Sequence, residues 1–240
     1  MVKTAVILAA GLGSRLKERT KEKPKGFLEI EGKSLIIRSI ENLISCGFEK
    51  IYIGTGYLSE FYERLADIYP QITCIKSDKY ETTSSMYTLY NMKDLVKDDF
   101  ILLESDLLYE VSALKYLLSE EQSDAILASG TTYSNDEVYI ETDERCNLIK
   151  MSKNKEELTS IFAELVGISK VSQFRYQLMC SAFENQDNPK IDYEYIMVKT
   201  SNETPFYVKK IENLIWCEID DENHLIRALS QILPKIKERA

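Results

Sequence analysis

The stretch TAVILAAGLGSR, residues 4–15, decides the fold of this chain. Its first half is a continuous apolar run, which is typical of a parallel strand buried on both faces. Gly11 and Gly13 then allow backbone N–H groups to approach a phosphate without a Cβ in the way. Arg15 and Lys25 place two cations within one loop of these glycines. The stretch therefore predicts a strand that runs directly into a phosphate-binding turn.

Two other glycine-rich phosphate motifs do not fit the spacing. The dinucleotide motif G-x-G-x-x-G needs a third glycine at position 16, where the chain has Leu16. A P-loop needs four residues between its first glycine and its Gly-Lys pair, but five separate Gly26 from Gly32-Lys33-Ser34. Because those five include the strand-like Phe27–Ile30, we expect Gly32-Lys33-Ser34 to be a tight turn into a helix.

Strand-like and helix-like segments alternate over the first two-thirds of the chain. We predict strands over residues 2–8, 50–54, 71–76, 99–103 and 125–129, and helices from residue 36 to Gly47 and over 58–68, 83–92 and 111–118. Later residues predict a hairpin (138–141 with 148–151), strands (162–171, 204–209, 214–219), helices within 172–201, and a last helix with its apolar stripe on Leu225, Leu229, Ile232 and Ile236. This alternation predicts an α/β fold with a mostly parallel twisted sheet and helices on both faces.

Length and charge restrict the classes of partner. The 240 residues, with no linker or repeat, suit one domain over residues 1–240. The 30 basic and 39 acidic residues give a net charge of −9, which argues against nucleic-acid and acidic-membrane partners. After the first strand, no apolar run approaches the roughly 18 residues that a membrane span needs.

Cysteine and histidine usage excludes other chemistries. The five cysteines are odd in number, scattered, and never in a C-x-x-C pair, which indicates reduced thiols in a cytoplasmic protein. His224 is the only histidine and begins the last helical pattern, where we expect it at the surface. A histidine-based catalytic triad would have to use that residue.

Carboxylates follow two of the predicted strands. Glu104-Ser105-Asp106 ends the apolar strand of residues 99–103, and Asp220-Asp221 ends the late strand of residues 214–219. The carboxyl ends of strands in α/β sheets face the ligand crevice, and Mg²⁺ binds proteins through one or two carboxylates. One residue of the late pair is also expected to cap the last helix. Glu104 is the weaker candidate of the first group.

These motifs together resemble those of the nucleotidyltransferases that activate sugar phosphates and alcohol phosphates. The family signature is a first strand, A-A-G-x-G-x-R, a short gap and P-K, which Leu8 to Arg15 and Pro24-Lys25 match. The resemblance implies a Rossmann-like nucleotidyltransferase fold, with Arg15 and Lys25 as catalytic cations on the phosphates. It also implies that Asp106 and Asp220 hold Mg²⁺, which leaves Asp221 as the helix cap. The nucleotide-binding residues it implies in the first loop are Leu8, Ala9, Ala10, Gly11, Gly13 and Ser14.

The hydroxyl-rich segment of residues 78–90 bears on the choice of nucleotide. By itself it predicts a loop followed by a helix whose first turn is capped by Thr83 or Ser84. It is also similar to the segment that contacts cytosine in choline-phosphate and 2-aminoethylphosphonate cytidylyltransferases. Small hydroxyls can bond the O2 and N4 of a pyrimidine, so we expect CTP. The expected nucleotide-binding residues of this segment are Thr83, Ser84 and Ser85, and Ser105, which follows the strand of residues 99–103, is expected to bind the nucleotide as well.

The acceptor is expected to bind beside the hairpin. The family resemblance places Lys153, Glu164, Asp192, Tyr193 and Glu194 there, although Lys153 could also be a solvated lysine. Carboxylates suit a primary amine, which favours 2-aminoethylphosphonate. Phosphocholine remains the alternative, because tyrosines can form a cage for a quaternary ammonium; the candidates are Tyr133, Tyr139, Tyr193 and Tyr195. A sugar-phosphate nucleotidyltransferase and an inactive nucleotide-binding regulatory domain are further alternatives.

Overall fold

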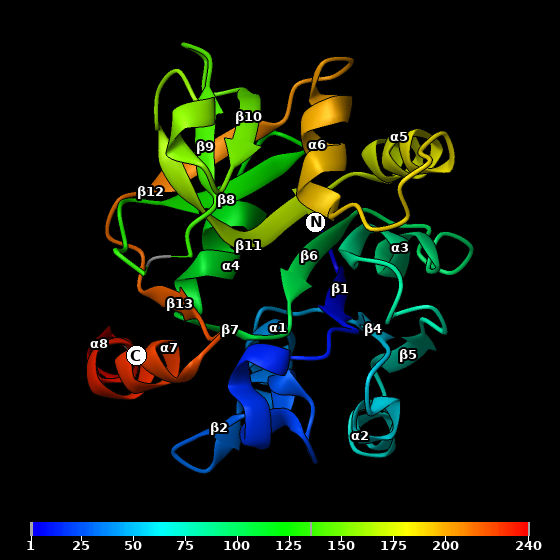
Figure 1. Cartoon of the computed structure of the whole chain (residues 1–240), viewed down its shortest axis with the longest axis vertical. Helices are drawn as coiled ribbons and strands as arrows, with labels where there is room; N and C mark the ends of the chain where they lie inside the picture. Colours follow the sequence, from blue (N-terminus) through cyan, green and yellow to red (C-terminus); the bar gives the residue numbers. More distant parts are fainter. Residues whose placement is uncertain (1, 135, 240) are drawn as a thin grey trace.

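A nine-stranded mixed sheet forms the centre of the computed structural model, which describes residues 2–134 and 136–239 (Figure 1). Its main order is β10-β9-β11-β6-β1-β4-β5, and β8 pairs with both β11 and β12. Strands β10 and β11 run opposite to the other seven, so the prediction of a mostly parallel sheet is confirmed. The strands are β1 (Thr4–Ala9), β4 (Lys50–Thr55), β5 (Ile72–Lys76), β6 (Phe100–Glu104), β8 (Ala125–Ser129), β9 (Tyr139–Thr142), β10 (Leu148–Ser152), β11 (Ala163–Val171) and β12 (Tyr207–Ile211).

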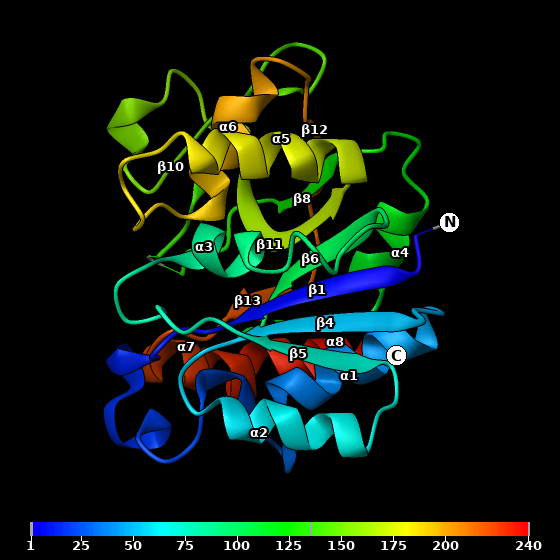
Figure 2. The ribbon, with the colours of Figure 1, turned by 90° about the vertical axis from the view of Figure 1, so that its right-hand side faces the viewer.

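Helices cover both faces of this sheet, as predicted. Ala5 and Ile7 of β1 pack on one side, and Val6 and Leu8 pack on the other, which explains why β1 is apolar at every position after Thr4. Figure 2 shows the strands β6, β1 and β4 between two groups of helices. One group is α1 (Leu35–Ser45), α2 (Ser59–Glu63) and α4 (Ser112–Leu118); the other is α3 (Ser85–Tyr90), α5 (Gln173–Glu184) and α6 (Tyr193–Ser201).

A bulge in β11 joins the sheet to the predicted hairpin. The register of β11 shifts between Leu165 and Ser169, and Gly167 within the shift has a φ of 78°. A Cβ at Gly167 would lie 3.1 Å from Oε2 of Glu104, so glycine permits the close approach of β11 to the end of β6. Beyond the bulge, β11 leaves β6 and pairs with β9, which places the hairpin β9–β10 beside the end of β6.

A short antiparallel pair of strands brings the carboxylates of residues 218–220 close to those of residues 104–106. Strand β13 (Trp216–Glu218) pairs with β7 (Leu107–Tyr109), so that Glu218 lies opposite Leu107. The N–H of Ile219 donates to the carbonyl of Asp106 at 3.1 Å. The sequence predicts β13 but not β7, because three residues directly after a charged turn carry too little periodicity to mark a strand.

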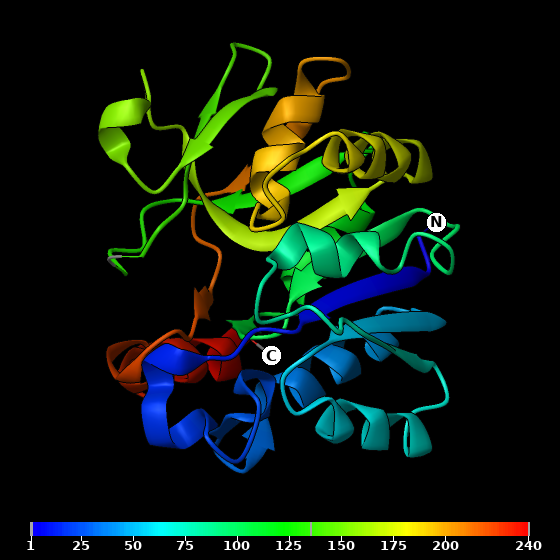
Figure 3. The same cartoon turned by 45° about the vertical axis from the view of Figure 1, so that its right-hand side comes forward.

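The C-terminal helices pack against the N-terminal loop. Helix α7 (Glu222–Arg227), a π-helical stretch (Ala228–Ile232) and α8 (Leu233–Arg239) form this region. Figures 1 and 3 show these red helices beside the blue segment that follows β1. Leu16 of that segment belongs to their apolar cluster, and Arg19 Nε donates to Glu222 at 2.7 Å.

The predicted apolar stripe of the last helix is wrong at Leu229, which is 42% exposed. The π-helical stretch contains an extra residue per turn, so the stripe continues instead through Ala228 and Leu233. Pro234 lacks the N–H that a regular α-helix would need at that position. This explains why the helical phase changes here.

The state of the cysteines and the length of the apolar helices can both be compared with what the composition predicts. All five cysteines are free thiols, as the sequence predicts. Within residues 2–134 and 136–239, no helix is both long and apolar enough to cross a membrane.

Arg175 is the largest fully buried side chain. Its guanidinium donates to the carbonyls of Thr200, Thr204 and Pro205, which join α5 to the end of α6 and to the loop before β12. Its Nε lies 3.7 Å from Oδ2 of Asp124, at the start of β8. Burial lowers the pKa of Arg175, although the Asp124 carboxylate opposes this. The charged state of Arg175 therefore depends on these acceptors, and its hydrogen bonds hold α5 against the end of α6.

We expect Arg175→Met to lower the free energy of unfolding by about 3 kcal/mol. The substitution removes the cation beside Asp124 and the hydrogen-bond donors to three buried carbonyls. Urea denaturation measures this, with Gln177→Met on the exposed face of the same helix as the control. A loss as small as that of the control would show that the buried guanidinium contributes no net stability.

Candidate active site

A cleft of about 490 Å³ opens at the carboxyl ends of β1 and β6. It brings together all of the residues predicted to bind the nucleotide, along with the predicted catalytic cations and metal ligands. These lining residues are Leu8, Ala9, Ala10, Gly11, Gly13, Ser14, Arg15, Lys25, Thr83, Ser84, Ser85, Ser105, Asp106 and Asp220. Two segments far apart in sequence, residues 8–15 and 83–85, therefore face the same space.

The glycine turn after β1 is shaped by contacts that a side chain would disturb. Gly13 has a φ of 63°, and a Cβ there would lie 3.1 Å from Cγ2 of Thr20. The Thr20 hydroxyl donates to the carbonyl of Gly13 at 2.9 Å. A Cβ at Gly56 would lie 2.7 Å from the carbonyl of Ala10. Glycine at these positions lets the turn stay close to its neighbours while the cleft stays open.

Lys25 lies at the centre of the charges in the cleft. Its ammonium donates to both Asp106 and Asp220, and lies 3.8 Å from Oε1 of Glu218. Burial alone would lower the pKa of Lys25, but the three carboxylates raise it well above its usual value. Lys25 is therefore charged at every physiological pH.

Asp220 is the carboxylate on which these cations converge. Nη2 of Arg15 lies 2.7 Å from its Oδ1, beside the contact with Lys25. Burial opposes ionisation of Asp220, yet the hydrogen bond with Glu218 and the charges of Lys25 and Arg15 hold its pKa far below the usual range. Asp220 is an anion that is neutralised by two cations in this arrangement.

The carboxylates at this position fit a hard divalent cation. Oδ1 of Asp106 and Oδ2 of Asp220 are buried, and neither has a hydrogen-bond partner in the described part of the chain. A second, overlapping set consists of Glu104, Asp106 and Glu218, whose oxygens lie within 4.8 Å of one another. Burial and the charge of Asp106 raise the pKa of Glu104 and of Glu218 well above the usual value. A bound cation would offset the free-energy cost of ionising these two carboxyl groups. Asp106 belongs to both sets.

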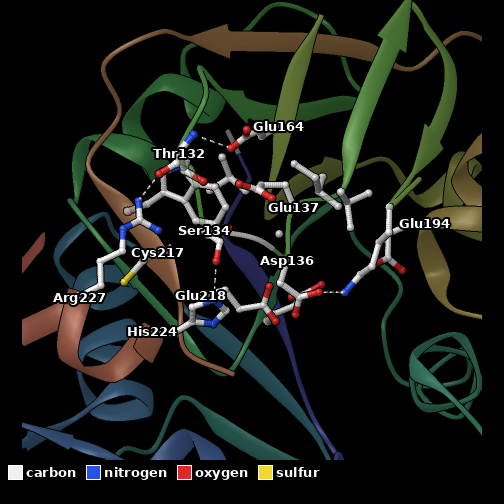
Figure 4. Close-up of a pocket in the computed structure, with 17 residues that line it drawn as sticks. Thr132, Ser134, Asp136, Glu137, Glu164, Glu194, Cys217, Glu218, His224 and Arg227 are labelled. Atoms are coloured by element: carbon white, nitrogen blue, oxygen red, sulfur yellow. Dashed lines mark hydrogen bonds and ion pairs between the residues drawn. The ribbon is translucent and has the colours of Figure 1, made fainter. Parts of the chain in front are cut away.

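The second cavity adjoins the cleft and contains three of the five predicted acceptor residues, Lys153, Glu164 and Glu194 (Figure 4). Glu104 and Glu218 line both spaces, so the two are neighbours that share these carboxylates. Asp136, which the sequence analysis missed, links them as well. Its carboxylate accepts hydrogen bonds from Nη1 of Arg15 and from Nζ of Lys153, the latter at 2.7 Å.

The other two predicted acceptor residues lie elsewhere. Asp192 lines the larger cleft, where its Oδ1 accepts hydrogen bonds from the hydroxyls of Ser84 and Ser85, the latter at 3.0 Å. The Tyr193 hydroxyl donates to Oε1 of Glu104 at 2.6 Å. Asp192 is thus bonded to the segment expected to contact the base, and Tyr193 orients a carboxylate at the junction of the two spaces.

His224 is buried, so the expectation of a surface histidine is wrong. The first turn of α7 lies beside Ser134, and His224 is 7% exposed. Nδ1 accepts the N–H of Asp220 at 3.3 Å, so Nε2 carries the proton that reaches the carbonyl of Ser134 at 3.0 Å. Asp221 accepts the N–H of His224 at 2.9 Å, which confirms its predicted role as the helix cap.

Comparison with known proteins identifies the family. The model of the MobA-like NTP transferase domain matches residues 5–166. The chain belongs to this family. It is a nucleotidyltransferase, and the resemblance found in its glycine turn and Pro24-Lys25 is confirmed at the level of the family.

Relatives match over different lengths. A CTP:phosphoglutamine cytidylyltransferase of Campylobacter jejuni is 28% identical, over 90% of this chain and 95% of that protein. A choline-phosphate cytidylyltransferase of Streptococcus pneumoniae is 36% identical, over 41% of this chain and 42% of that protein. The solved inositol-1-phosphate CTP transferase of T. maritima has the same fold, with a TM-score of 0.85 at 21% identity, over 99% of this chain and 97% of that one.

Glu194 should make the stability of this nucleotidyltransferase depend on pH. Burial, together with the Asp192 carboxylate, raises the pKa of Glu194 to about 7. A folded-state pKa above the unfolded value means that the folded protein binds more protons, so stability decreases as pH rises from the unfolded pKa, about 4.5, to 7. We expect the wild type to lose about 3 kcal/mol over this window relative to Glu194→Gln.

Urea denaturation between pH 4.5 and 8 measures this difference, with Glu203→Gln at an exposed position as the control. Parallel pH profiles for the wild type and Glu194→Gln would mean that Glu194 ionises in the ordinary range.

Proposed function

We propose that this protein transfers CMP from CTP to a small acceptor with a phosphate or phosphonate at one end and a primary ammonium at the other. The first candidate is 2-aminoethylphosphonate, which would give CMP-2-aminoethylphosphonate and pyrophosphate. The observation that carries the proposal is the buried Lys25 between Asp106 and Asp220, in a nucleotide-sized cleft that shares Glu104 and Glu218 with an acidic cavity.

The choice of CTP rests on the wall of the cleft formed by residues 83–85. Ser84 and Ser85 supply hydroxyls there, and Asp192 fixes both of them by accepting their hydrogen bonds. Because each hydroxyl donates its proton to Asp192, its oxygen remains as an oriented acceptor for the N4 amino group of cytosine. The relatives that are CTP enzymes support the same nucleotide.

The proposed reaction is an in-line substitution at the α-phosphorus of CTP. An acceptor oxygen, already anionic near neutral pH, forms the new P–O bond, and the bond to pyrophosphate breaks, so no general base is required. Arg15 and Lys25 stabilise charge on the transferring and leaving phosphates, which makes catalysis mainly a matter of position and electrostatics. Asp106, with Asp220 or Glu218, would hold Mg²⁺. The ion would supply positive charge to the phosphate oxygens.

The proposal that the acceptor has an ammonium at one end rests on the charge of the second cavity. Glu164 and Glu194 offer carboxylates, and burial raises the pKa of both, so a cationic ligand would relieve the cost of their ionisation. Lys153 would meet the phosphonate, in exchange for its contact with Asp136.

An aromatic cage for choline has less support. None of the four candidate tyrosines lines the second cavity within the described residues, where Trp216 supplies a single aromatic face. Tyr133 and Tyr195 are exposed, and Tyr139 and Tyr193 are buried. We therefore favour the primary amine over phosphocholine.

The free thiols also support a reducing compartment such as the cytoplasm.

Lys25→Ala should lower kcat by two or more orders of magnitude while the protein stays folded. A preorganised cation near reacting phosphates is worth several kcal/mol, about 2.7–4 by analogy with a lost oxyanion donor. The measurement is pyrophosphate release, and Lys23→Ala, an exposed neighbour paired with Glu29, is the matched control. If Lys25→Ala retains the kcat of the control, Lys25 has no role at the phosphates.

The acceptor is tested by comparing kcat/KM for 2-aminoethylphosphonate, phosphoethanolamine and phosphocholine with CTP and Mg²⁺. A carboxylate–ammonium hydrogen bond is worth about 1.5–3 kcal/mol, and trimethylation removes every donor. We expect phosphocholine to be about a hundredfold poorer than the primary amines. The opposite order would refute the amine proposal, and Trp216 would become the first candidate for recognition of the quaternary ion.

A further inference from the structure

Arg227 is a cation of the second cavity without an acidic partner. Its Nη2 donates to the carbonyl of Thr132 at 3.0 Å, and within residues 2–134 and 136–239 no carboxylate lies close enough to form an ion pair with it. Lys153, the other long cation of this cavity, is paired with Asp136. A guanidinium has five N–H donors, so Arg227 retains donors for a ligand.

Glu164 is held next to Arg227 by the same residue. The N–H of Thr132 donates to Oε2 of Glu164 at 2.8 Å, while the carbonyl of Thr132 accepts from Arg227. Figure 4 shows Arg227 and Glu164 on either side of Thr132, across the cavity from Asp136 and Glu194. One end of the cavity therefore presents a fixed carboxylate and a fixed guanidinium that are not paired with each other.

We propose that the acceptor carries an α-amino acid group at this end, which narrows the substrate class of the proposed function and rests on it. Arg227 binds the carboxylate of the acceptor, and Glu164 binds its ammonium. The phosphonate or phosphate extends toward Lys153 and Asp106. Planar guanidinium and carboxylate groups match each other in two parallel hydrogen bonds. An amino-phosphonate without a carboxylate satisfies Glu164 but leaves Arg227 unpaired.

The test compares two acceptors that differ by one carboxylate, 2-aminoethylphosphonate and 2-amino-3-phosphonopropanoate, with CTP and Mg²⁺. In the wild type we expect kcat/KM to be about tenfold or more higher for the acceptor with the carboxylate. In Arg227→Met, kcat/KM for that acceptor should decrease about 10- to 100-fold, whereas kcat/KM for 2-aminoethylphosphonate should change less than about threefold. Arg227→Lys should restore part of the preference, because it keeps the charge without the planar fork.

Lys235→Met is the matched control, since it removes one exposed cation from α8 outside this cavity. Turnover of 2-aminoethylphosphonate serves as an internal test of folding. Equal losses for both acceptors in Arg227→Met would assign Arg227 a structural role on Thr132 and overturn the proposal, as would a wild-type preference for 2-aminoethylphosphonate.

The two proposals fail in different ways. If neither acceptor releases pyrophosphate, the proposed function fails. Calorimetric binding of the same two compounds to the wild type and Arg227→Met then decides the inference about the cavity. Tighter binding of 2-amino-3-phosphonopropanoate that depends on Arg227 supports it, and equal binding contradicts it.

Discussion

The ion cluster of Lys25 with Asp106 and Asp220 is the interaction on which the arrangement of the site depends. Its three members come from the first loop, the end of β6 and the segment after β13, so the whole chain must fold before they meet. A buried ammonium is tolerated only with opposite charges beside it. The pairing of β7 with β13 and the packing of the C-terminal helices on the segment after β1 both serve to bring these groups together.

The cluster also explains how an acidic protein can bind a triphosphate. With a net charge of −9, the surface as a whole repels anions. In the cleft, however, Arg15 and Lys25 are held by Asp106, Asp136 and Asp220. These carboxylates keep the cations in place. A metal ion on the free oxygens of Asp106 and Asp220 would compensate the carboxylates and release Lys25 toward the phosphates.

The sequence predicts the sheet well, and it also predicts which residues meet at the cleft beside β1 and β6, because both depend on local signals. The apolar run of β1, the glycines after it and the strand of residues 99–103 each show their periodicity or turn chemistry directly. The hydroxyls of residues 83–85 could likewise be assigned to the cleft, since the loop after a strand faces the crevice.

The contacts that the sequence could not predict depend on tertiary packing. Asp136 lies between β8 and β9 in a segment without periodicity, and its role appears only in its contacts with Arg15 and Lys153, which are distant in sequence. His224 contacts that same segment, which lies far from it in sequence. Glu218 ends β13 and Asp220 lies two residues beyond it, and both approach Asp106 through the pairing of β13 with the three-residue strand β7.

The measurement that tests this account most directly is the position of the metal ion in crystals grown with Mn²⁺ and a non-hydrolysable CTP analogue. Anomalous scattering from Mn²⁺ locates the ion independently of the protein model. The account predicts a single manganese bound by Asp106 together with Asp220 or Glu218, and the Lys25 ammonium moved from the carboxylates to a phosphate of the nucleotide. Manganese bound away from Asp106, or a nucleotide bound while Lys25 still bridges Asp106 and Asp220, would contradict it.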